Sequence, residues 1–114
     1  MAVIRNIKPG DNVAVARLIR TVMPEFGASD QGFAIHDKEV DNMAGSYNIP
    51  GAAYFVCEDY GKLVGCGGVG PLAGGTEDMC ELKKMYFLRE GRGRGLGQQL
   101  LSRCLEAARQ LGYK

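Results

Sequence analysis

The sequence has almost no net charge: 14 lysines and arginines stand against 13 acidic residues, which leaves +1 over 114 residues. A protein so close to neutrality has no overall field to attract nucleic acid or an acidic membrane, so any affinity for anions must be local. No apolar stretch approaches the roughly 18 residues of a membrane-spanning helix, and the N-terminus lacks the pattern of a signal peptide. The sequence therefore predicts a soluble, cytoplasmic protein without nucleic-acid or membrane partners.

Histidine and clustered cysteine are also scarce. His36 is the only histidine, and the four cysteines are scattered without a CxxC pair. A zinc site needs clustered ligands of these types, so no metal site is expected, and a surface or capping role is favoured for His36. Cysteines in apolar runs usually behave as small buried hydrophobes, which is the role predicted for most of Cys57, Cys66, Cys80 and Cys104.

A single small domain over residues 1–114 is expected, because 46% hydrophobic residues suffice for one core at this length. Apolar periodicity predicts strands at 2–8, 53–58, 63–69 and 79–87 and helices at 12–23, 37–45 and 96–111. Asp59-Tyr60-Gly61-Lys62 is typical of a hairpin connection, so the second and third strands should pair antiparallel. The segment 25–35 has no regular pattern and is expected to be an irregular loop.

The clearest functional signal is the segment Arg92-Gly93-Arg94-Gly95-Leu96-Gly97, which lies between an apolar strand and an amphipathic helix. Alternating glycines let the backbone come close to a ligand, and the first turn of a helix has unpaired N–H groups. Such a junction is suited to bind an anion, above all a phosphate or pyrophosphate. The segment is called the cradle below.

Two other glycine patterns are weaker. Residues 65–70 match the letters GxGxxG, but Pro71-Leu72-Ala73-Gly74-Gly75 follows and cannot open the helix that a dinucleotide site requires. Those glycines are interpreted as marks of a bulged or closely approached strand. The arginine-glycine alternation of the cradle also occurs in nucleic-acid-binding tails, but its place at a strand-to-helix junction argues against that use.

Arg92-x-x-Gly95-x-Gly97, between the strand Cys80–Phe87 and an amphipathic helix, resembles the signature motif of the GNAT superfamily of N-acetyltransferases. The order of the upstream elements is similar too, so the resemblance covers the whole sequence. It implies an α/β fold of the α+β type, with a mixed, mainly antiparallel sheet of about four strands flanked by three helices. In that family the backbone amides of the motif hold the pyrophosphate of acetyl-CoA, which makes acetyl-CoA the expected acetyl donor.

The resemblance also implies which residues bind this cosubstrate. The last residues of the preceding strand would bind the pantetheine arm and the thioester oxygen through backbone groups. The motif would hold the pyrophosphate, with two arginines adding positive charge. The expected binding residues are Met85, Tyr86, Phe87, Arg92, Gly93, Arg94, Gly95, Leu96, Gly97 and Gln98.

Glu81 is the candidate catalytic residue, because several relatives carry a glutamate at this position that acts as general base. Between Cys80 and Leu82 its carboxylate would be partly desolvated and its pKa raised, which suits it to accept a proton from an ammonium through water. The alternative is a structural glutamate at a sheet edge, paired with Lys83 or Lys84. The sequence leaves both open.

The sequence stops at Lys114, where relatives continue with a fifth strand, a fourth helix and two further strands. We expect a shortened acetyltransferase: a fragment, a gene cut by a frameshift, or a small protein completed by a partner chain. The expected function is transfer of an acetyl group to a primary amine of an unidentified small molecule or protein. The alternative is an inactive acyl-CoA-binding or assembly module. An uncovered fourth strand predicts a homo-oligomer, in the simplest case a dimer.

Overall fold

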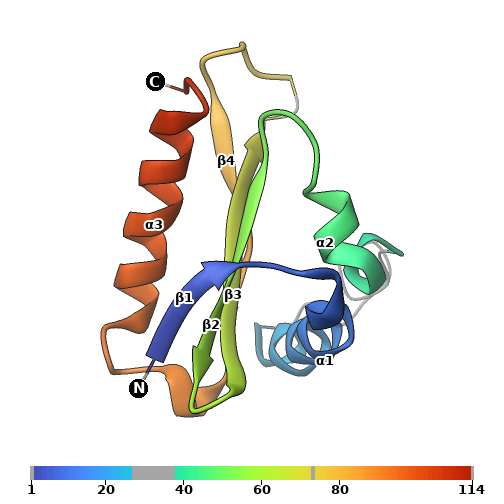
Figure 1. Ribbon diagram of the computed structural model, residues 1–114, viewed down its shortest axis with the longest axis vertical. Coiled ribbons are helices and arrows are strands. Elements are labelled where there is room, and N and C mark those ends of the chain that lie inside the picture. The colour runs from blue at the N-terminus through green and yellow to red at the C-terminus, as the bar shows by residue number, and fades with distance from the viewer. Residues whose placement is uncertain (1, 27–37, 73, 114) are drawn as a thin grey trace.

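The protein is described by a computed structural model that covers residues 2–26, 38–72 and 74–113. A four-stranded antiparallel sheet has the order β1-β2-β3-β4, so strands that follow one another in sequence are neighbours in space. Helix α3 covers one face of this sheet, and α1 and α2 lie on the other (Figure 1). The bounds are β1 Ala2–Asn6, α1 Asn12–Val22, α2 Met43–Ser46, β2 Ala53–Asp59, β3 Lys62–Pro71, β4 Cys80–Phe87 and α3 Leu96–Gln110.

The fold class predicted from the sequence is confirmed, including the pairing of β2 with β3. Their connection is a two-residue turn in which Tyr60 and Gly61 both have positive φ, 51° and 82°. This turn matches the right-handed twist of the paired strands, which explains why it joins them so tightly. None of the helices in the described ranges is long and apolar enough to cross a membrane.

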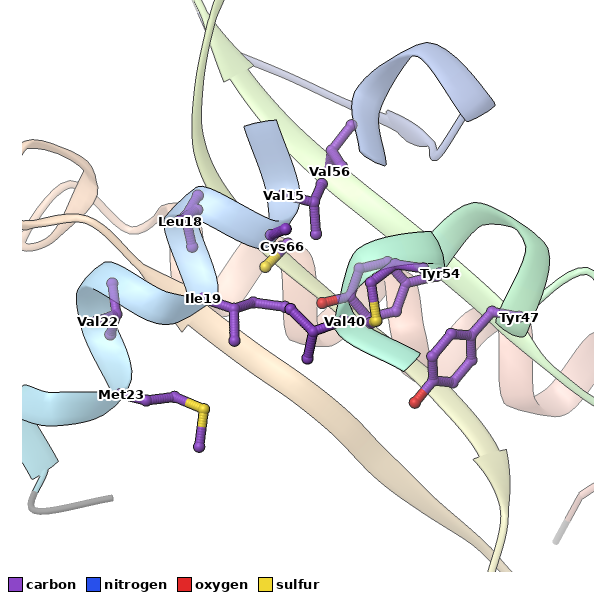
Figure 2. Close-up of a cluster of buried hydrophobic side chains, with 12 residues drawn as sticks. Val15, Leu18, Ile19, Val22, Met23, Val40, Tyr47, Tyr54, Val56 and Cys66 are labelled. Carbon is purple, nitrogen blue, oxygen red and sulfur yellow. The ribbon is translucent and has the colours of Figure 1, made fainter. Parts of the chain in front are cut away.

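Two apolar layers hold the helices to the sheet. On the first face α1 and the segment 38–47 bury a cluster against β2 and β3, shown in Figure 2: Val15, Ala16, Leu18, Ile19, Val22, Met23, Val40, Met43, Tyr47, Tyr54, Val56 and Cys66. On the second face α3 buries residues four apart, which is the spacing of one helical stripe: Leu96, Leu100, Cys104 and Ala108. Of the cysteines in strands, Cys57 and Cys66 are buried free thiols, as predicted, whereas Cys80 is only half-buried; Cys104 on α3 is buried as well.

The second predicted helix differs from the structure. Residues Lys38–Asn42 form a 3-10 helix, and only Met43–Ser46 are α-helical, because the Asn42 side chain accepts a hydrogen bond from the Gly45 amide and caps a new start. Asp37, with which this helix was expected to begin, lies outside the described residues, as do His36 and most of the loop expected at 25–35. The first strand ends at Asn6 rather than residue 8, since a 3-10 turn begins at Pro9.

The glycines of β3 allow close approach of the neighbouring strands. A Cβ at Gly65 would meet the ring of Phe87 at 2.2 Å, and one at Gly68 would meet the carbonyl oxygen of Ala53 at 2.2 Å. No side chain fits at either position without displacing a neighbour. The interpretation of this GxGxxG pattern as a closely approached strand is therefore confirmed.

Candidate functional site

The cradle is anchored to the sheet immediately after β4. The Leu88 amide donates to the Val64 carbonyl oxygen at 2.8 Å, and a 3-10 turn follows at Arg89–Gly91. Gly91 is buried, and a Cβ there would meet both Phe87 and Val64 at 3.1 Å. The chain therefore passes close against the hairpin before it turns into α3.

Two glycines then place the start of α3. Gly93 and Gly95 have φ of 74° and 76°, a left-handed conformation that other residues rarely adopt, and a Cβ at either would meet no atom within 4 Å. Gly95 is the N-cap of α3 and supplies no capping side chain; the first bond inside the helix is Gln99 N–H to the Gly95 carbonyl, 3.1 Å. The open space at Gly93 and Gly95 therefore adjoins the N-terminus of α3, the positive end of the helix dipole, which is an arrangement suited to binding an anion.

The two arginines of the cradle are held by defined contacts. The Arg94 guanidinium pairs with Asp59 at 2.7 Å and also donates to the Glu90 carbonyl oxygen at 3.3 Å, which joins the cradle to the end of β2. This hydrogen bond from Arg94 lowers the pKa of Asp59 below its usual value. Arg92 Nε donates to the Phe87 carbonyl oxygen at 3.0 Å. Both side chains are exposed, so their positive charge lies at the surface beside the helix start.

β4 carries a bulge opposite the glycines of β3, where the sequence predicted a bulged or closely approached strand without placing an inserted residue on β4. Cys66 pairs with Tyr86 and Gly68 with Lys83, so β4 has one more residue than β3 over this interval. Lys84 has a φ of 43° and is, with Tyr60, one of two non-glycine residues with positive φ in the described chain. Such a conformation in a lysine is strained and often marks a functional position.

The bulge determines which way the predicted binding residues of β4 face. Met85 and Phe87 pack toward α3, whereas Tyr86 packs toward the α1 cluster. A signal for the bulge exists in the sequence: Lys83-Lys84 interrupts the alternation that Cys80, Leu82, Met85 and Phe87 otherwise describe. Two consecutive polar residues within an alternating strand are typical of an inserted residue.

Two carboxylates, Glu81 on β4 and Glu39 from the segment 38–42, form ion pairs with lysines of β4. Glu81 forms an ion pair with Lys83, and their side chains are 40% and 26% exposed, respectively. This pairing fits the structural alternative raised for Glu81, and it also leaves the carboxylate accessible to a water molecule. Glu39, which the sequence did not single out, accepts hydrogen bonds from Lys84 and from the Tyr47 hydroxyl. Its approach to β4 joins residues 45 positions apart, so no local pattern could have revealed it.

Comparison with known proteins identifies the family. The family model described as the acetyltransferase (GNAT) family matches residues 16–114. The chain belongs to this family. It is 44% identical to an uncharacterized N-acetyltransferase of Escherichia coli over 98% of the chain and 68% of that protein. A second uncharacterized N-acetyltransferase, from Schizosaccharomyces pombe, is 33% identical over 84% of the chain and 58% of its own length. Both names support acyltransferase activity in the family.

Solved structures of the family share the fold. A GNAT acetyltransferase from Staphylococcus aureus has a TM-score of 0.80 at 16% identity, over 96% of this chain and 68% of its own. One from Brucella melitensis, solved in complex with acetyl-CoA, has a TM-score of 0.78 at 19% identity, over 99% of this chain and 71% of its own. At such low identity the likeness concerns the fold, and it covers the sheet and the three helices described above.

Proposed function

We propose that this chain binds acetyl-CoA in the cradle and transfers its acetyl group to a primary amine. One observation supports the proposal above all others: in a chain of the GNAT family, Gly93 and Gly95 leave open space beside the N-terminus of α3, shortly after a bulged β4. The pyrophosphate would accept hydrogen bonds from Leu96, Gly97 and Gln98 N–H. The relative from Brucella melitensis was crystallised with acetyl-CoA, and an aminoglycoside acetyltransferase of similar fold with coenzyme A.

The reaction would be direct acyl transfer. The nitrogen of a neutral amine attacks the thioester carbon, the C–S bond breaks, and the amine proton reaches the departing coenzyme A thiolate through solvent or a protein group. Backbone groups of Met85, Tyr86 and Phe87 lie beside the bulge, where an N–H can stabilise the negative charge that develops on the thioester oxygen. Positioning the two reactants side by side supplies much of the remaining rate enhancement.

Glu81 is the proposed general base for the acceptor. An acceptor ammonium must lose a proton before it attacks, and a carboxylate on β4 can accept that proton through water. The ion pair with Lys83 orients the carboxylate. Acceptors differ widely among proteins that share one fold, so a panel of amines is needed to find the acceptor of this chain.

The test has two measurements on the same protein. Coenzyme A should raise the melting temperature, since a ligand that binds only the native state stabilises it. Incubation with acetyl-CoA and a panel of primary amines should then release free coenzyme A, detected with a thiol reagent. Thermal stabilisation by coenzyme A without release of free coenzyme A from acetyl-CoA would identify a non-catalytic acyl-CoA-binding module. A melting temperature unaffected by saturating coenzyme A would refute the proposal that the cradle binds this ligand.

A further inference from the structure

A buried tyrosine on the α1 side of the sheet donates a hydrogen bond to the bulge at Lys84. The Tyr54 hydroxyl donates to the Lys84 carbonyl oxygen at 2.7 Å, although the two residues are 30 positions apart. Tyr54 is 2% exposed and projects from β2 into the cluster under α1, as Cys66 does from β3 (Figure 2). A hydroxyl in such a place must have a partner, because an unsatisfied buried polar group is costly. Here the partner is the carbonyl of the strained residue.

This hydrogen bond fixes a whole peptide unit. The carbonyl of Lys84 and the N–H of Met85 belong to one planar peptide, which is trans, so they point in opposite directions. With the carbonyl held by Tyr54 in the α1 cluster, the Met85 N–H must point away from that cluster. Met85 N–H is among the backbone groups assigned above to the thioester oxygen. Its direction is therefore set by a residue that cannot itself reach the substrate.

We propose that Tyr54 is a positioning residue, which holds the Lys84–Met85 peptide so that the Met85 N–H is presented to acetyl-CoA. The inference rests on the proposed function and adds a residue to it. Without the hydroxyl, a peptide next to a lysine at a φ of 43° would relax toward the preferred strand conformation and rotate its N–H. A donor aligned before the reaction is what stabilises a developing oxyanion, so rotation would reduce the rate.

The other described contacts to the Lys84 carbonyl and side chain do not replace this one. The Cys66 thiol lies 3.8 Å from the same carbonyl oxygen and is a weak donor. The Lys84 ammonium pairs with Glu39, but that contact is at the end of a flexible side chain and leaves the peptide plane free to rotate. Tyr54 is the strong donor on the carbonyl, and its ring is packed against Tyr47 with centroids 5.0 Å apart.

The experiment compares Tyr54→Phe with Tyr113→Phe. Each variant keeps the ring and loses one hydroxyl that donates to a backbone carbonyl at 2.7 Å, in Tyr113 to that of Gly51, far from β4 in the sequence. Three quantities are measured for both: the Kd for coenzyme A, kcat for acetyl transfer, and the exchange rate of the Met85 amide in the complex with acetyl-CoA, by NMR. Thermal unfolding shows that both variants are folded at the assay temperature.

Tyr54→Phe should lower kcat by about tenfold or more, short of the ~10²–10³ lost when an oxyanion donor is itself removed. In the complex with acetyl-CoA its Met85 amide should exchange about tenfold faster, because a rotated N–H loses its hydrogen bond to the thioester oxygen. The Kd for coenzyme A should stay as in wild type, and Tyr113→Phe should change neither kcat nor that amide.

Wild-type kcat and Met85 exchange in Tyr54→Phe would overturn the inference, and so would an equal loss of kcat in both variants. A wild-type chain that releases no coenzyme A would instead count against the proposed function. In that case the Met85 exchange rates alone decide whether Tyr54 holds the bulge.

Discussion

Gly95 offers the sharpest test of the cradle, because the chain contains a matched control at the other end of the same helix. Gly95 precedes α3 and Gly112 follows it; their φ values are +76° and +94°, and a Cβ at either meets no atom within 4 Å. Valine at either position therefore suffers backbone strain without a clash. A left-handed conformation costs an L-residue about 1–2 kcal/mol.

Both Gly95→Val and Gly112→Val should lower the melting temperature by similar amounts, of the order of 5–15 °C for a domain of this size. Coenzyme A at a hundredfold excess over its Kd should stabilise wild type by about 2.7 kcal/mol. Gly112→Val should keep that gain in full. Gly95→Val should lose it, because the isopropyl group occupies the space through which a phosphate reaches the first amides of α3.

The assay is a thermal titration with coenzyme A, read as the shift at each ligand concentration rather than as an absolute melting temperature. The unliganded difference between variants then cancels, and only the binding contribution remains. Equal shifts in Gly95→Val and Gly112→Val would refute the assignment, since the ligand would then be insensitive to a side chain placed in the cradle.

Three further expectations concern other parts of the chain. Glu81→Gln should keep coenzyme A affinity and lower the rate with amine, most strongly at low pH; an unchanged pH–rate profile would make Glu81 structural. Hydrogen bonds from Arg5 at 2.8 and 3.0 Å lower the pKa of Asp11, so this carboxylate stabilises the fold above its unfolded pKa of about 3.9, and the gain disappears as pH falls through the lower folded value. Asp11→Asn should lower the free energy of unfolding by roughly 1–3 kcal/mol at neutral pH and weaken its dependence on pH in the acid range, which urea titrations at several pH values would show. We also expect self-association through β4, an edge of the described sheet on which Leu82 is 48% exposed; sedimentation at micromolar concentration should show a dimer that Leu82→Lys weakens and Val13→Lys, on α1, does not.

The fold could be predicted from the sequence to a large extent, because its elements depend on local patterns. Leu96, Leu100 and Cys104 recur at the spacing of one helical face, and Tyr60-Gly61 suits a tight hairpin. The segment 38–46 was harder to predict, since its division into a 3-10 helix and α2 depends on the Asn42 cap. The cradle was predictable for the same reason as the helices: its glycines adjoin the elements that they position.

The bulge and its supports could not be predicted with equal success. The contact between Tyr54 and Lys84 spans 30 residues, and that between Glu39 and Lys84 spans 45. Each contact joins segments that are far apart in the sequence, so no local sequence pattern reveals it. The Lys83-Lys84 doublet was a visible sign of the inserted residue, but its consequence, a lysine at positive φ, required the register of β3 against β4.

The proposed site consists mainly of backbone amides, which is compatible with the low identity, 16% and 19%, of solved structures that share this fold. Every residue has an N–H group, so the chemistry of binding places no demand on most side chains. The residue type matters instead where the backbone has an unusual conformation. These positions are Gly93 and Gly95, which have positive φ, and Tyr54, which donates a hydrogen bond to the bulge. Substitutions at these positions should therefore impair binding or turnover more than their small changes in chemistry suggest.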